Sequence, residues 1–276
     1  MNPIFILLDF ETTGLDPLKN NRIVQLACML IRIKNKKEIS FNNIINPNIP
    51  VSKYSKASLI HKIPMQKLKT ASSFDTVFLE LLDWIQFQKK REDADKVILC
   101  AHNGFDFDFN FLTTEIVRYN LENKINLDLY LSDSLIIFRK WFHDFENHKL
   151  GYIYEKVRNK KLDGAHNAIV DVNAMRKIIT SYNNNQVNKL GIYYLEKDMI
   201  DKCALKDLKE EINLAKNKIN FMKINLNPEI FYINSTYDER DIIKKDKGKW
   251  DDIQRLYYYK SKYDFDNATI KNRFLF

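Results

Sequence analysis

Two acidic residues follow a short apolar run near the start of the chain. Residues 4–8 are all apolar, a pattern typical of a buried β-strand. Asp9 and Glu11 come at the end of this run, two positions apart. Because alternate residues of a strand point to the same side, the two carboxylates should lie side by side. Hard oxygen ligands suit a divalent cation such as Mg²⁺. The segment therefore predicts a core strand that carries part of a metal site.

Two later segments add acids and a histidine in the same apolar setting. Residues 101–112 contain Asp106 and Asp108, and residues 165–171 contain His166 and Asp171 just before a helical pattern. Apolar residues frame each polar group, so the acids should lie at the rim of a core. Asp106 and Asp108 are both candidates, because they share a side if the segment is extended and diverge if it is helical.

This set of side chains favours metal-dependent cleavage of a phosphodiester. Four clustered carboxylates repel one another unless cations are bound. Two divalent ions about 4 Å apart can activate a water and hold the leaving 3′ oxygen. Mg²⁺ uses few protein oxygens, so four acids suffice for two ions, and Mn²⁺ is expected to substitute. His166 would be the general base toward the attacking water, since histidine titrates near neutral pH.

The three segments together resemble the DEDDh exonucleases, the superfamily of the epsilon proofreading subunit and the three-prime repair exonucleases. The resemblance covers residues 1 to about 183. It rests on Asp9-x-Glu11-Thr-Thr-Gly-Leu, on Phe107-Asp108-x-x-Phe-Leu, and on His166 followed five residues later by Asp171. It implies a ribonuclease H-like α/β fold with a mixed five-stranded sheet flanked by helices. It also implies 3′–5′ exonuclease activity that releases nucleoside 5′-monophosphates.

The resemblance assigns roles to individual residues. Asp9, Glu11, Asp108 and Asp171 are the implied metal ligands, and Asp106 is left to cap the helix or to be solvated. Residues 56–63 are similar to a family segment that reads Glu-Ala-x-x-x-His-Gly-Ile, although Lys62 replaces its glycine. The implied contacts to the terminal nucleotide are Gly14, Ala57, His61 and Phe107, with Thr12 beside them.

The substrate class follows less directly. We expect nucleic acid with a free 3′ end, with DNA favoured over RNA, and replication or repair proteins as possible partners. Two alternatives stay open: an exoribonuclease of the same fold, and a non-catalytic nucleic-acid-binding domain. The second is disfavoured because all five required residues are present. A formal net charge of +8 suits a polyanionic partner without proving one.

Composition limits the setting of the protein. The chain has 276 residues, of which 45% are hydrophobic, enough for a sizeable core. Its three cysteines are far apart, which excludes a disulfide framework and favours an intracellular, reducing compartment, the cytoplasm or the nucleus. Cys28 and Cys100 are expected to be core thiols. No apolar stretch is long enough for a transmembrane helix, and Asp9 interrupts the first apolar run, which favours a strand over a signal peptide.

Periodicity predicts the elements of the first 183 residues. Strands are expected at residues 4–8, 23–33, 39–45 and 97–100, and helices at 74–87 and 109–119, from about 134 and 149, and at 167–182. Strands followed by alternating helices and strands predict a mixed α/β sheet. Asp133 is expected to cap a helix, and His102 to make structural hydrogen bonds.

The remainder of the chain divides into two further parts. Residues 184–225 are expected to form a linker, best placed at 183–186, and a charged helix within 190–224 that packs on the catalytic domain. Residues 226–276 are expected to form a small accessory module of α+β type. Its tyrosines, Trp250 and the run from Lys247 to Asp251 resemble a short module of unknown function appended to replication and DNA-processing proteins. Its aromatics and lysines could bind nucleic acid or form a small core.

Overall fold

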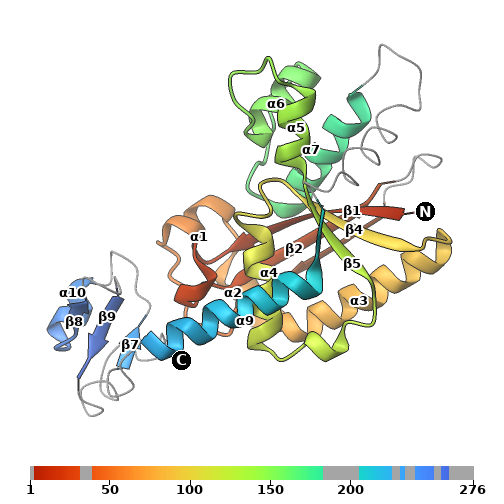
Figure 1. Cartoon of the computed structure of the whole chain (residues 1–276). Helices are drawn as coiled ribbons and strands as arrows, with labels where there is room; N and C mark the ends of the chain where they lie inside the picture. The colour runs from red at the N-terminus through yellow and green to blue at the C-terminus, as the bar shows by residue number, and fades with distance from the viewer. Residues whose placement is uncertain are drawn as a thin grey trace.

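A computed structural model shows the arrangement of the chain (Figure 1). It describes residues 3–31, 39–182, 205–225, 231–233, 240–251 and 256–260. The expected linker at residues 183–186 lies outside these ranges. No helix among the described residues has the length and hydropathy needed to cross a bilayer.

A mixed six-stranded sheet forms the centre of the larger part, in the order β3-β2-β1-β4-β5-β6. The strands are β1 (Pro3–Thr12), β2 (Ile23–Leu30), β3 (Ile39–Ile44), β4 (Lys96–Ala101), β5 (Leu129–Asp133) and β6 (Leu205–Asp207). Strands β1, β4 and β5 are parallel neighbours, while β2, β3 and β6 run antiparallel to their partners. β1 therefore lies in the interior of the sheet, which explains its nearly unbroken apolar sequence.

Helices cover both faces of this sheet (Figure 1). Ile4, Ile6 and Leu8 of β1 belong to a core with α3 (Phe74–Arg91), α4 (Asp108–Arg118) and α9 (Leu208–Asn225). Phe5 and Leu7 belong to the core on the other face, with α5 (Ser134–Trp141), α6 (Leu150–Arg158) and α7 (Ala168–Ser181). Strand alternation thus directs the odd-numbered residues of β1, including Asp9 and Glu11, to the α7 side.

Shorter elements complete the described chain. The helices α1 (Lys56–His61) and α2 (Met65–Thr70) and the 3-10 turns η1 (Pro17–Lys19) and η2 (Glu122–Lys124) lie between the main elements. The C-terminal part has α10 (Arg240–Lys245) and a second sheet, β7-β9-β8, made of β7 (Phe231–Ile233), β8 (Lys249–Asp251) and β9 (Leu256–Tyr259). Ile233, Ile243 and Tyr259 form its small buried core. Trp250 is 45% exposed and packs edge-on against Tyr257.

The α/β class and the helix-flanked mixed sheet are confirmed, with differences in the strands. The sheet has six strands instead of five, because Leu205–Asp207 pairs antiparallel with β5. Leu205 was expected inside a helix, but the helix begins at Leu208 and packs on α4 through buried Leu208, Ile212 and Ala215. Periodicity also missed β5. β6, with three residues, is too short for its period to be read from sequence.

The predicted structural roles of several residues are confirmed. Cys28 and Cys100 are free, buried thiols. The Asp133 carboxylate accepts the backbone N–H of Leu135 at 2.8 Å and caps α5. The His102 ring bonds the Ser134 hydroxyl and the His148 carbonyl at 3.0 and 2.9 Å. These bonds tie the end of β4 to α5 and to the start of α6.

Candidate active site

Asp9 and Glu11 lie on the last four residues of β1, beyond the point where β4 separates from it. The parallel pairing of β1 with β4 ends at Leu7 and Cys100, while the antiparallel pairing with β2 continues. One edge of β1 is therefore open beside the two carboxylates. The acids lie within the strand rather than after it, which holds their backbone rigidly.

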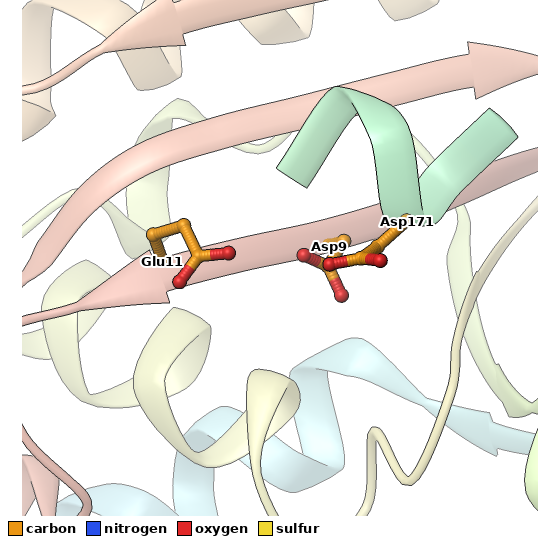
Figure 2. A group of neighbouring side chains, drawn as sticks. All are labelled: Asp9, Glu11 and Asp171. Atoms are coloured by element: carbon orange, nitrogen blue, oxygen red, sulfur yellow. The ribbon is translucent and has the colours of Figure 1, made fainter. Parts of the chain in front are cut away.

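Asp171 approaches these two residues from the first turn of α7. Carboxylate oxygens of Asp9, Glu11 and Asp171 all lie within 4.8 Å of one another. Figure 2 shows the three side chains converging from β1 and α7. α7 is fixed to the sheet by Val172, Met175 and Ile178, all fully buried. Two segments separated by about 160 residues are thus brought together by core packing.

Asp108 reaches the open edge of β1 from the start of α4. Its Oδ1 accepts the backbone N–H of Phe10 at 3.1 Å, and the residue is only 2% exposed. Asp106 is exposed, as expected for the acid outside the site. Asp133 shapes the preceding turn by accepting the backbone N–H groups of Asn103 and Phe105 at 2.9 and 3.2 Å. Asp108 is the first residue of α4, whereas Asp106 lies in the turn before it, so the start of the helix separates the two acids.

Burial raises the pKa values of all four carboxyl groups, and neighbouring acids raise those of Asp9, Glu11 and Asp108 further. Burial, then the charges of Asp108, Asp171 and Glu11, raises the pKa of Asp9 well above its usual range. Burial, then Asp171, raises the pKa of Glu11 to about 7. Burial is also the main cause that raises the pKa of Asp108 to about 8 and that of Asp171 to about 6. Divalent cations would neutralise this charge, so the donor set fits them.

His166 lies in the exposed segment just before α7. Its backbone has φ +65°, a left-handed conformation that few non-glycine residues adopt. Its backbone N–H donates to Asp171 Oδ2 at 2.9 Å. The candidate base is therefore attached directly to one of the candidate ligands, while its side chain lies outside the protein core.

The loop after β1 is clamped to α4 by a buried ionic network that sequence patterns did not indicate. Arg22 forms two bonds to the Glu115 carboxylate, at 2.7 and 2.9 Å, and Arg118 adds a third at 2.7 Å. Arg118 also donates to the Pro17 carbonyl at 2.8 Å. Glu115 is 1% exposed. The sequence signal that could have indicated this network is Glu115, a charged residue within the apolar stripe of α4.

The residues expected around the terminal nucleotide lie on three separate segments. Thr12 is buried, and its hydroxyl donates to the Gly14 carbonyl at 2.6 Å. Gly14 abuts the Asn21 side chain, leaving no room for a Cβ. Phe107 packs on Phe111 and lines a cavity of about 300 Å³ with Leu15 and Asn110.

Ala57 and His61 lie on α1. His61 is buried, and its Nδ1 accepts the Ile63 N–H at 3.0 Å. Its Nε2 is buried and has no hydrogen-bond partner among the residues that the structure describes, and burial lowers the pKa of the ring to about 4. The ring is therefore neutral at neutral pH. For all five of these residues, contact with substrate stays a prediction.

Comparison with known proteins places this site in a family. The family model described as exonuclease matches residues 6–179. The PolC-type DNA polymerase III of Ureaplasma parvum is 27% identical over 194 residues, which are 69% of this chain and 12% of that protein. The DNA polymerase III epsilon subunit of Rickettsia felis is 31% identical over 140 residues, 50% of this chain and 55% of that protein. The chain thus spans about an eighth of the PolC-type relative's length.

Solved structures agree on the fold. The nuclease domain of 3′hExo, described as a DEDDh family member and bound to rAMP, superposes with a TM-score of 0.55 at 18% identity. The match covers 75% of this chain and 96% of that one. Because the family model spans well over half of the sequence, the chain belongs to the exonuclease family.

Proposed function

We propose that the protein removes nucleotides from the 3′ end of DNA in a Mg²⁺-dependent reaction and releases nucleoside 5′-monophosphates. The observation that carries this proposal is the convergence of Asp9, Glu11 and Asp171 within 4.8 Å, with Asp108 on the adjoining edge of β1 and His166 attached to Asp171. These are the metal ligands and the base that the chemistry requires.

The carboxylates would hold two divalent ions. When bound, such ions supply Lewis-acid charge that favours attack by water and departure of the 3′ oxygen. Asp9 and Glu11 hold their positions through the β1–β2 pairing, Asp108 through its bond from Phe10 N–H, and Asp171 through the packing of α7. The protein's own contribution is thus a rigid frame of oxygen donors.

His166 would take the proton of the attacking water. The water oxygen forms a bond to phosphorus, the bond from phosphorus to the 3′ oxygen breaks, and the proton passes to an imidazole nitrogen. The departing 3′ oxygen takes up a proton from solvent, so the products are a nucleotide with a 5′-phosphate and a strand with a new 3′-hydroxyl. The exposed position of His166 lets its ring approach a substrate that lies over the acids.

The DNA preference is supported by curated relatives that are named as DNA polymerase III proteins. An association with replication or repair proteins is part of the same proposal. The exoribonuclease alternative stays open, and one structural neighbour with a TM-score of 0.53 is titled for recognition of a histone mRNA stem-loop by a 3′-exonuclease. At 16% identity that likeness bears on the fold alone.

One experiment tests activity, polarity and sugar preference together. Single-stranded DNA and RNA of equal length and sequence are incubated with Mg²⁺, with Mn²⁺ or with chelator, each strand carrying a bulky block at one end. We expect nucleoside 5′-monophosphates from 5′-blocked DNA with either metal, and no product with chelator or from 3′-blocked strands. Faster digestion of RNA would favour the alternative, and digestion of 3′-blocked strands alone would refute the polarity.

A further inference from the structure

A buried glutamine connects the central sheet to the segment that carries His166. Gln25 lies on β2, is 5% exposed, and is the one amide in a strand of otherwise apolar residues. Its Nε2 donates to Asn42 Oδ1 at 3.0 Å and to Asn167 Oδ1 at 3.1 Å. Its Oε1 accepts the Ala168 backbone N–H at 3.3 Å. The amide therefore bridges β3 and the start of α7.

The start of α7 depends on this glutamine for its cap. Asn167 occupies the N-cap position, and asparagine is among the residues that cap helices best. Its side chain nevertheless makes no capping bond, and its Oδ1 accepts from Gln25 instead. The N–H of Ala168, the first helical residue, is satisfied by Gln25 Oε1. A side chain from a distant strand has taken over a role that is normally local.

Residues 164–167, the segment before α7, depend on such side-chain hydrogen bonds more than α7 itself does. Residues 164–167 are exposed, and both Gly164 and His166 have positive φ values, +77° and +65°. Two side chains bind this segment and the adjoining helix start: Asp171 accepts the His166 N–H, and Gln25 holds residues 167 and 168. α7 itself is anchored by its buried apolar stripe. Loss of Gln25 should therefore disturb His166 much more than Asp171.

We propose that Gln25 is a positioning residue that holds the His166 segment over the carboxylates. This inference rests on the proposed function, because it assumes that His166 is the base. One other route of action must be separated from it. Gln25 is the register partner of Glu11 across β1 and β2, so its loss could instead act on a metal ligand.

A double-mutant cycle separates the two routes. The full-length protein and its Gln25→Leu, His166→Ala and Gln25→Leu/His166→Ala variants are compared by kcat on single-stranded DNA and by calorimetric Mn²⁺ affinity. We expect Gln25→Leu to lower kcat about 10–100-fold, the usual effect of losing a residue that orients an active-site group. Mn²⁺ affinity should be unchanged. The double variant should match His166→Ala within about twofold, because the base is already absent.

Matched controls guard against a loss of fold. Asn43→Ala removes the amide next to Asn42 on the opposite face of β3, where it contacts Glu80, and should leave kcat unchanged. Asn167→Ala removes an exposed partner of Gln25 and should give a smaller loss that again disappears when His166 is absent. This variant serves as the test if Gln25→Leu does not fold.

The outcomes distinguish this inference from the proposed function. If the kcat of the double variant falls by the product of the two single losses, or if Gln25→Leu binds Mn²⁺ more weakly, the inference is overturned. Either result would indicate an effect on Glu11 or on the sheet. Full activity of Gln25→Leu beside an impaired His166→Ala would also overturn it, while leaving the proposed function intact. Full activity of His166→Ala would refute the base and this inference together.

Discussion

The proposed metal ligands and the proposed base are held in opposite ways. Asp9 and Glu11 are part of an interior strand, and Asp171 projects from a helix whose inner face is fully buried. His166 is exposed on a left-handed backbone, outside α7, and is attached through single hydrogen bonds. The carboxylates are therefore preorganised by the core, whereas the base can move and depends on a few polar contacts.

Loss of a carboxylate should have the largest effect. We expect Asp9→Asn, Glu11→Gln, Asp108→Asn and Asp171→Asn each to lower kcat by about 10⁴-fold or more, because metal charge contributes several kcal/mol at the transition state. Turnover and melting should be measured together. The folded state should persist and should be more stable in chelator, since a repelling charge is removed. The exposed Asp106→Asn is the control; if it matches Asp108→Asn in effect, the choice between the two acids is wrong.

Loss of the base should be milder and should leave metal binding intact. His166→Ala is expected to lower kcat about 10²–10⁴-fold, the usual contribution of a positioned general base. Titration with Mn²⁺ should give the wild-type affinity. His143→Ala, which removes an exposed histidine paired with Asp144, should behave as wild type. Weaker Mn²⁺ binding by His166→Ala would instead identify His166 as a metal ligand, and its role would no longer differ from that of the carboxylates.

The buried ionic network of Arg22, Glu115 and Arg118, which holds the loop after β1, should contribute strongly to stability. Glu115→Ala leaves the Arg22 and Arg118 guanidinium groups without their shared carboxylate, so we expect a loss of about 3–5 kcal/mol in the free energy of unfolding. Denaturant unfolding measures it. Lys209→Ala, at an exposed pair with Asp128, should lose less than about 1 kcal/mol. Equal losses of unfolding free energy in Glu115→Ala and Lys209→Ala would show that the loop after β1 is not held by the network.

The smallest expected effect is a dependence of Tm on pH, which should be present in chelator and absent with bound metal. Burial raises the pKa values of Glu11, Asp108 and Asp171 to about 7, 8 and 6, and neighbouring acids add to the rise for Glu11 and Asp108. An acid whose pKa is higher in the folded chain keeps its proton there, so the contribution of these acids to stability is greatest near pH 4 and is lost as the pH rises toward 8. In chelator, Tm should drop by about 5 °C or more between pH 5 and pH 8.

Saturating Mg²⁺ should flatten this dependence, because the ions bind the deprotonated carboxylates. Asp9→Asn should reduce the slope in chelator, whereas Asp106→Asn should retain it. A Tm that rises with pH in chelator would contradict the assignment of the four acids to one repelling cluster.

The sequence alone predicted the chemistry of the site and the class of the fold. The choice of Asp108, His166 and Asp171 rested on motif spacings that resemble those of the DEDDh exonucleases, whereas the pairing of Asp9 with Glu11 followed from local strand alternation. The same local patterns predicted the helices that flank the sheet. Exposure of Asp106 and the cap at Asp133 are further local features that the structure bears out.

Only the tertiary structure decided how these segments meet. The bond from Phe10 to Asp108, the network at Glu115 and the bridge made by Gln25 join residues about 90 to 140 positions apart, and a single sequence carries no period that links them. The pairing of β6 with β5 is of the same kind, because a three-residue strand is defined by its partner rather than by its own pattern. Local propensity acts along the chain, whereas core packing chooses which distant groups become neighbours.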